Sequence, residues 1–393
     1  MGSPIKHRSP LTLIFGTVFL DLVGFGIVIP VLPLYAERFG ASPLVIGLLL
    51  GVYSAMQCLF APILGRLSDR VGRRPVLLLS VIGTSIGFLL TGLAHSLWLL
   101  FAARILDGIT GGNISTAQAY IADVTPPNER SRGMGLIGAA FGLGFIFGPA
   151  IGGLLSHVSL AAPFLFASIL AAANALAIYL FLPESLPVER RHQVHEHASF
   201  AALFQEARKR PIGVILLAYF FTTVSFSLLT ATYALFTERR LGYTAVQNGY
   251  IFAGQGLVGA VIQGGLLGWL VKAFGDKKLI IVGTATLALS LFLLPTNTTT
   301  SVLLLLTTGV AIGHSLVLAP LSGLASKSAH ETAQGRILGL MQSAASFARI
   351  VGPVLGGWLL NYDAMHLSEA FGRTAYTAGG AVTLIAVALA TAL

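Results

Sequence analysis

Long apolar stretches separated by short polar segments run along the whole chain. In the first part of the chain they lie near residues 11–35, 44–66, 75–94, 97–120, 133–156 and 161–182. After a longer polar stretch, six more lie near residues 211–237, 246–271, 278–295, 301–325, 337–360 and 371–393. A helix of about 20 apolar residues crosses the hydrocarbon core of a bilayer. The pattern therefore predicts twelve transmembrane helices joined by short loops, with no room for a separate soluble domain.

Composition agrees with a membrane protein. Hydrophobic residues make up 55% of the chain and charged residues only 10%, against about 25% charged in an average soluble domain. The net charge of +9 comes from short clusters between the apolar stretches, and no basic stripe of the kind that binds nucleic acid is present. The single cysteine, Cys58, excludes an internal disulfide and most metal sites. We therefore expect no metal and no cofactor.

The positions of lysine and arginine predict the orientation. If the N-terminus is cytoplasmic, 18 of the 24 fall in inside segments, four fall in outside loops, and two, Arg104 and Arg349, fall within spans. Such a bias places both termini in the cytoplasm. We expect a multi-pass protein of the inner or plasma membrane, in which the polar stretch 183–210 is a solvated cytoplasmic linker.

The chain contains an internal repeat. Residues 132–153 (RGMGLIGAAFGLGFIFGPAIGG) match residues 336–357 (RILGLMQSAASFARIVGPVLGG) at an offset of 204. Two further matches keep the same order and nearly the same offset. They pair Leu34–Gly47 with Leu235–Gly249, and Gly65 and Gly72 with Gly268 and Gly275.

This repeat predicts a duplication of six spans, with a transport site between the two copies. The expected division is an N-terminal six-helix bundle over 1–182, the linker over 183–210 and a C-terminal six-helix bundle over 211–393.

The loop after the second span reads GRLSDRVGRRP, residues 65–75. Its glycines allow a tight turn with close helix approach, and an aspartate among arginines can form an ion-pair latch. The loop resembles the signature loop of the major facilitator superfamily, which braces one half against the other and separates as the cytoplasmic side opens. The expected latch residues are Gly65, Asp69, Arg70, Gly72, Arg73 and Arg74.

The fifth span carries the pattern GxxxGPxxGG. Glycines on one helical face permit close packing, and the proline bends the helix. The pattern resembles the antiporter motif of the drug:proton exporters in this superfamily. Its residues here are Gly144, Gly148, Pro149, Gly152 and Gly153.

The first span reads DLVGFGIVIPVLP over residues 21–33 and resembles the span-one motif of the twelve-span drug:proton antiporters. Asp21 lies about ten residues into the membrane segment, where an unpaired carboxylate is costly. It is the first candidate for loading and releasing a proton, and a structural, hydrogen-bonded aspartate is the alternative.

Arg104, in the fourth span, matches a family arginine associated with proton transfer, and Asp107 lies one helical turn later on the same face. Either Arg104 and Asp107 form a static pair, or Arg104 moves between Asp107 and Asp21 in a proton relay.

The second half is poorer in charge within its spans. Arg349 occupies the repeat position that Phe145 holds in the first half, and an arginine in a span needs a partner. That partner is either an acid across the cavity or an anionic group of the substrate. Some polar residues in the spans are expected to pack helices instead. The candidates for the substrate cavity are Gln57, Asn113, Gln118, Gln255, Gln263, His314, Gln342 and Arg349.

The family likeness covers the whole chain and is strongest over residues 16–153, where the sequence looks like the tetracycline-exporter branch and its multidrug relatives. Two departures matter. The span-three aspartate and the span-eight histidine of that branch fall at Gly87 and Gly259 here. A broader or different substrate than tetracycline is therefore expected.

The resemblance implies an all-α membrane protein of twelve helices in two pseudo-symmetric six-helix bundles. It implies export of small amphipathic molecules or drugs by proton antiport with alternating access. The alternative is a carrier of the same superfamily for an anionic metabolite or lipid, working by uptake or symport, which Arg349 and His314 favour. No nucleophile or metal-protease motif is present, so we do not expect an enzyme. The expected partners are a small-molecule substrate, protons and the lipid bilayer, without nucleic acid, and we expect a monomer.

Overall fold

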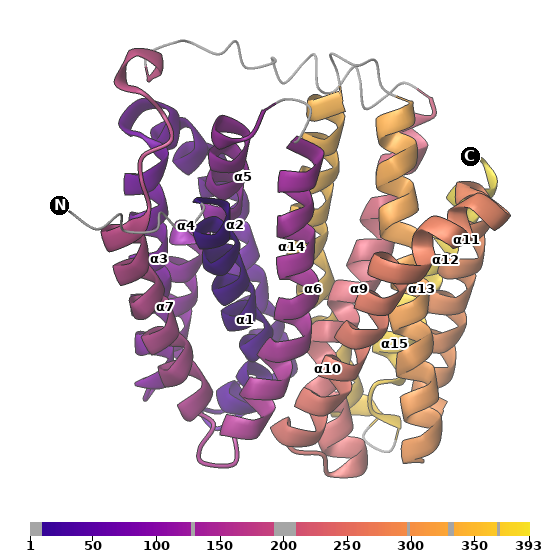
Figure 1. The fold of residues 1–393 in the computed structure, drawn as a ribbon. Coiled ribbons are helices and arrows are strands. Elements are labelled where there is room, and N and C mark those ends of the chain that lie inside the picture. The colour runs from indigo at the N-terminus through magenta and orange to yellow at the C-terminus, as the bar shows by residue number, and fades with distance from the viewer. Residues whose placement is uncertain (1–9, 127–129, 192–209, 297–298, 329–333, 368–369) are drawn as a thin grey trace.

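The structure, a computed structural model, describes residues 10–126, 130–191, 210–296, 299–328, 334–367 and 370–393. This part of the chain is almost entirely helical, and its long helices run side by side (Figure 1). The helices of the first half are α1 (Pro10–Glu37), α2 (Pro43–Val71), α3 (Arg73–Gly92), α4 (Leu97–Thr110), α5 (Asn113–Val124), α6 (Arg130–Leu155) and α7 (Ala162–Phe181). A short turn, η2 (Val188–Arg190), follows. The helices of the second half are α9 (Ile212–Leu241), α10 (Ala245–Val261), η3 (Ile262–Leu266), α11 (Leu267–Phe274), α12 (Asp276–Leu293), η4 (Leu294–Thr296), α13 (Thr300–Lys327), α14 (Gln334–His366) and α15 (Arg373–Thr391).

Eleven helical segments of the described chain are long and apolar enough to cross a membrane. In the second half, α10, η3 and α11 together form one of these crossings. The remaining crossing is made by α4 and α5 together, which are separated only by Gly111 and Gly112. The span predicted near 97–120 is thus present, and these two glycines interrupt its helix. Two consecutive glycines have low helix propensity, and the backbone at Gly112 lies directly against Ala61 and Leu64 of α2.

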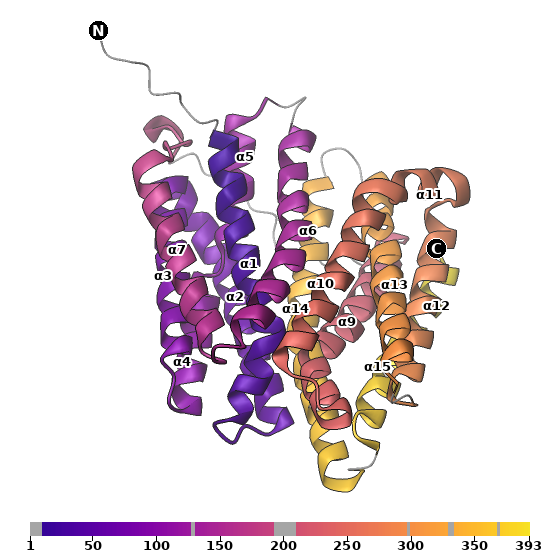
Figure 2. The ribbon, with the colours of Figure 1, turned by 60° about the horizontal axis from the view of Figure 1, so that its bottom comes forward.

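The helices form two groups with the same internal packing. The helices of the first half lie on one side of the molecule and those of the second half on the other (Figures 1 and 2). In the first group α1 packs against α6, α3 against α7, and α2 against α4. In the second group α9 packs against α14, α12 against α15, and α10 against α13. These are corresponding helices of the sequence repeat, so the fold is two pseudo-symmetric six-helix bundles. The exact domain boundaries remain a prediction, and residues 192–209 of the expected linker lie outside the described residues.

The two bundles meet at a pair of crossings built from glycine and proline. In one, Gly47 of α2 lies against Pro353 and Gly357 of α14. In the other, Gly249 of α10 lies against Pro149 and Gly153 of α6. A side chain at Gly47 or Gly249 would overlap the facing backbone, so only glycine permits this approach.

The two ends of the molecule differ. We call the end with the turns at Gly72 and Gly275 the basic end, and the end with the turns at Gly40 and Gly242 the distal end. The basic end is uppermost in Figure 1. The glycine crossings lie towards the distal end, where Arg239 of α9 also forms an ion pair with Glu37 of α1 at 3.0 Å.

The basic end is open in this conformation. Among the described residues, no hydrogen bond or ion pair joins the two halves there. Several glycines near this end of α2, α6, η3, α11 and α14 have no atom within 4 Å of the place where a Cβ would stand. They are Gly65, Gly135, Gly138, Gly264, Gly265, Gly268 and Gly339. The protein is therefore closed at the distal end and open at the basic end.

Candidate functional site

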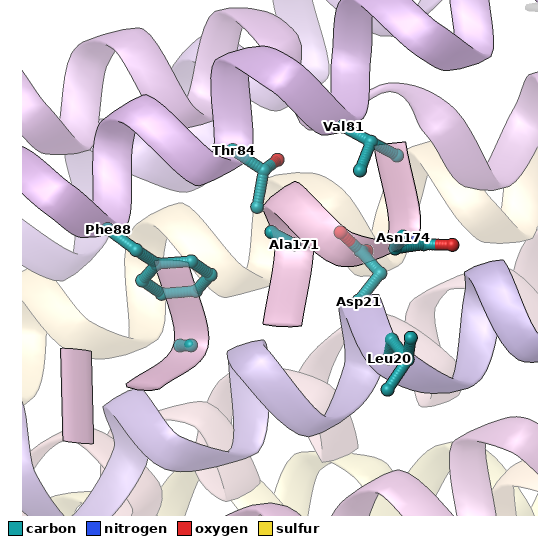
Figure 3. A pocket seen from close by; sticks show the side chains of 8 residues that line it. Leu20, Asp21, Val81, Thr84, Phe88, Ala171 and Asn174 are labelled. Carbon is teal, nitrogen blue, oxygen red and sulfur yellow. The ribbon is translucent and has the colours of Figure 1, made fainter. Parts of the chain in front are cut away.

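Asp21 lies near the middle of α1, between two small cavities that each have room for about one water molecule. The first cavity is lined by Asp21 and by other residues of α1, α3 and α7. The carboxyl of Asp21 points from α1 towards Thr84, Ala171 and Asn174 (Figure 3). The polar neighbours that act on Asp21 are the amide of Asn113 and the carboxyl of Asp107. Within the described chain Asp21 forms no ion pair.

Arg104 and Asp107 form an ion pair of 3.0 Å within α4. Both side chains are almost completely buried, with 3% and 4% of the residue exposed. The guanidinium of Arg104 also lies 5.6 Å from the ring centres of Phe88 and Tyr53, which adds a cation–π attraction. Of the two arrangements predicted for Arg104, this conformation contains the pair with Asp107.

The second cavity joins Asp21 to this pair. Its lining includes Asp21, Tyr53, Arg104 and Asp107. Both carboxyls line this cavity, so the arrangement can support proton exchange between them through water.

Gly87 and Gly108 make room for the charged pair. A Cβ at Gly87 would stand 2.9 Å from the Cβ of Asp107, and one at Gly108 would stand 2.6 Å from the backbone oxygen of Tyr53. Gly87 is the position at which the tetracycline-exporter branch is expected to carry an aspartate. In this chain Asp107 occupies the space which that side chain would need.

Tyr53, which the sequence analysis did not single out, lies at the centre of these residues. Its hydroxyl interacts electrostatically with Asp21, Asp107, Arg104 and, from the second half, Arg349. A tyrosine in an apolar span gives no signal of this kind by itself. Its position depends on the packing of α2 against both α4 and α14.

Gln57 fastens α2 to the break between α4 and α5. Its Nε2 donates to the backbone oxygen of Gly111 at 2.8 Å and to the hydroxyl of Tyr53 at 3.2 Å. Helix breaks within a membrane need such partners for the freed backbone groups. Gln57 therefore has a structural task in addition to any contact with substrate.

Arg349 lies on α14, on the second-half side of Tyr53. Its Nη2 donates to the hydroxyl of Ser346 at 3.2 Å, and Tyr219, Tyr53 and Cys58 lie close enough to act on its charge. In the described part of the chain no acid pairs with it.

The other predicted cavity residues are dispersed. His314 of α13 stacks on Phe226 of α9 with ring centres 3.7 Å apart. Asn113 is buried beside Asp21, and Gln255 of α10 is half-buried. Three more are exposed: Gln118, Gln263 and Gln342.

The loop predicted as a latch is bound within the first half. Arg73 pairs with Asp69 at 2.6 Å and with Asp123 of α5 at 3.1 Å. The carboxylate of Glu184 accepts hydrogen bonds from the backbone N–H groups of Arg73 and Arg74, at 2.9 and 3.2 Å. It thereby caps the start of α3, where an anion is favourable.

Arg70 is exposed, and a Cβ at Gly65 would have no atom within 4 Å. Of the contacts described for this loop, none reaches the second half. The beginning of the expected solvated linker is bound to the first half, because Glu184 accepts from α3 and Ser185 donates to Asp123 of α5.

The antiporter motif seats α1 against α6. Gly144, Gly148 and Gly152 lie one turn apart and face Leu22, Gly26 and Ile27 of α1 respectively. On another face of α6, Pro149 and Gly153 form the crossing with α10. The motif thus holds the helix that carries Asp21 and also joins the two bundles. In the second half, Gly352 and Gly356 seat α9 against α14 in the same way.

Two pseudo-symmetric helical bundles with buried charges beside their interface are the architecture of a membrane transporter. A family profile described as "Major Facilitator Superfamily" matches residues 14–271 and, in a second overlapping match, residues 215–393. The chain belongs to the Major Facilitator Superfamily.

Two relatives cover nearly the whole chain. It is 37% identical over 359 residues to the tetracycline resistance protein, class C, of Escherichia coli, a match that covers 89% of both chains. It is 29% identical over 384 residues to multidrug resistance protein 2 of Bacillus subtilis (strain 168), covering 97% of this chain and 96% of that one. The resemblance to the tetracycline-resistance and multidrug branch is confirmed.

Solved structures agree on the fold. The human organic anion transporter MFSD10 (TETRAN) superposes with a TM-score of 0.72 at 26% identity, covering 98% of this chain and 99% of that one. A bacterial homologue of the human lysosomal transporter Spinster, in an inward-facing and occupied conformation, gives a TM-score of 0.80 at 19% identity, over 100% of this chain and 97% of that one. The second likeness concerns the fold alone.

Proposed function

We propose that the protein exports small amphipathic molecules, drugs among them, in exchange for protons, by alternating access of a site between the two bundles. The observation that carries the proposal is Asp21, a carboxyl in mid-membrane without an ion-pair partner in the described chain, beside the Arg104–Asp107 pair. The relatives named for tetracycline and multidrug resistance support export. We do not favour uptake or symport of a metabolite.

In this mechanism Asp21 carries the proton. When the open end admits water, the carboxyl exchanges a proton with solvent, and when that end closes the proton is retained. The Arg104–Asp107 pair holds a fixed dipole beside it, and Asp107 is the second group within reach of the shared cavity. Because an ionised, unpaired carboxylate is costly in the membrane, the empty carrier returns across its cycle with Asp21 protonated. This requirement couples substrate export to proton entry.

The proposed orientation places the basic end and both termini in the cytoplasm, as the bias of lysine and arginine favours. The conformation is then inward-open. The proposal needs a substrate, protons and a bilayer, and a single chain suffices for it.

The test uses protein reconstituted in liposomes that contain a pH-sensitive dye. Addition of tetracycline or of a lipophilic cation such as ethidium should drive protons in the direction opposite to the substrate. Asp21→Asn should reduce this movement to the rate of empty liposomes, while exchange of labelled for unlabelled substrate persists because it needs no net proton transfer. The control Glu189→Gln changes an exposed acid in η2 and should behave as the native protein. Full coupling in Asp21→Asn would remove Asp21 from this role, and substrate binding without proton movement across the panel would contradict antiport.

A further inference from the structure

Arg349 is a cation for which the described residues supply no counter-ion. It lies in α14, and its Nη2 donates a hydrogen bond to the hydroxyl of Ser346, three residues earlier. Within the described chain it forms no ion pair. A charge in this position is expensive in a membrane protein unless something neutralises it. The equivalent position of the first half holds Phe145, so the arginine is not demanded by the fold.

The nearby acids of the first half do not pair with it in this conformation. Asp107 is held by Arg104 at 3.0 Å. Asp21 interacts with Asn113 and Asp107 and lines the two small cavities among α1, α2, α3, α4 and α7. The groups that do act on Arg349 are the hydroxyls of Tyr219 and Tyr53 and the thiol of Cys58. None of these three is a carboxylate.

The free N–H groups of Arg349 remain accessible. The residue is only half-buried, and its nitrogens are absent from the fully buried polar atoms that lack a partner in the described part of the protein. They are therefore not completely sealed from solvent. Arg349 stands on α14, which packs against α2 of the first bundle and against α9 of the second. A small molecule entering there meets one guanidinium and two phenols.

This set of groups matches one class of ligand. A guanidinium offers a planar pair of N–H donors that fits a carboxylate or similar oxyanion. A phenol hydroxyl adds a further donor, and the Tyr53 hydroxyl already accepts from Gln57, which leaves its own hydrogen free to donate. A cationic group at this position would be repelled by Arg349.

We infer that Arg349, with the hydroxyls of Tyr53 and Tyr219, binds an anionic group of the transported molecule. The inference rests on the proposed function and adds to it the charge of the substrate. The Tyr53 hydroxyl also interacts electrostatically with Asp21 and with the Arg104–Asp107 pair. The bound anion is thus one side chain away from the proton-carrying group, and Tyr53 is the direct link between the two halves of the site.

Three probes with the same fluorophore and different charge test the inference: dansylglycine, its uncharged amide and the cationic dansylcadaverine. Their dissociation constants are measured by fluorescence anisotropy with the purified protein. The native protein should bind dansylglycine more tightly than the amide and the cation. Arg349→Gln should weaken dansylglycine binding at least about tenfold, since a hydrogen bond to a charged group is lost, and should leave the amide unchanged. Arg349→Lys should retain part of the preference for dansylglycine, because lysine keeps the positive charge but lacks the planar pair of N–H donors of the guanidinium.

The matched control is Arg373→Gln, which removes an exposed arginine at the distal end and should not alter any of the three constants. Unchanged binding of the amide shows that Arg349→Gln is folded. If native protein binds dansylglycine no more tightly than the amide, or if Arg349→Gln weakens all three probes equally, the inference is wrong. If the variant keeps its anion preference and loses only proton movement, Arg349 instead pairs with an acid in another conformation, and the inference is also wrong.

Proton movement with tetracycline and ethidium separates this result from the proposed function. Substrate-driven proton movement without a preference for dansylglycine would leave antiport standing and remove the anion site. A preference for dansylglycine without proton movement for any substrate would support the anion site and contradict antiport.

Discussion

At the scale of single residues, the glycines of the basic-end loop differ in what they do. Gly72 has φ of 107° and ψ of 159°, a conformation that is almost restricted to glycine. A Cβ there would also overlap the carboxylate of Glu184, which caps α3. Gly65 is helical, and a Cβ there would contact nothing.

Gly72→Ala should therefore lower the free energy of unfolding by about 1–3 kcal/mol, the usual cost of such backbone strain. Gly65→Ala should leave the unfolding midpoint unchanged or raise it slightly, because alanine favours the helix. Thermal unfolding of the purified variants in detergent measures both. An equal loss of stability in the two variants would show that the loop is packed differently from the structure described here.

At the scale of helices, the break between α4 and α5 positions the charged pair. Asp107 lies four residues before Gly111, in the last turn of α4. Side chains added at Gly111 and Gly112 would stand against Tyr53, Gln57 and Leu64 of α2, so the close approach of the break to α2 requires glycine. The freed oxygen of Gly111 is satisfied by Gln57.

Gln57→Leu removes that donor and leaves a buried backbone oxygen unpaired, which costs about 1–3 kcal/mol. The expected result is a lower unfolding midpoint, measured in the presence and absence of substrate. Gln118→Leu, on the exposed side of α5, is the control and should be stable. If Gln57→Leu keeps its stability and loses only substrate binding, Gln57 contacts the substrate and does not stabilise the break between α4 and α5.

At the scale of the whole molecule, the sequence predicted most of the architecture. Length of apolar stretches and the repeated glycine-proline pattern suffice for twelve crossings in two related bundles, since both are local signals. Asp21, Arg104 and Asp107 are noticeable as charges inside apolar stretches. Tyr53 and Glu184 were missed because each owes its position to contacts with distant segments. A tyrosine in a span and a glutamate in a polar linker look ordinary until α2 is packed on α4 and residue 184 is folded against α3.

The closed state of the distal end depends on contacts between the two halves rather than on a single residue. Within the described chain an ion pair joins the halves there, Glu37 to Arg239 at 3.0 Å, with 22% and 34% of the side chains exposed. The guanidinium of Arg239 also lies 4.5 Å from the ring centre of Phe371. The glycine crossings must slide or separate when this end opens, and the ion pair must break.

Glu37→Gln should therefore favour the state that is open at the distal end. The gain is small, because a partly exposed pair contributes about 0–1 kcal/mol, which shifts the ratio of the two states by at most about fivefold.

Spin labels on cysteines placed at Ser159 and Arg373, in a Cys58→Ser background, report the distance between the halves at this end by double electron–electron resonance. The population with the longer distance should grow in Glu37→Gln and in Arg239→Gln. The double variant should add nothing beyond Arg239→Gln, because one interaction is removed in all three. Arg38→Gln changes the exposed neighbour of Glu37 and should leave the distribution unchanged. A distribution that does not respond to Glu37→Gln would mean that the glycine crossings alone hold the distal end closed.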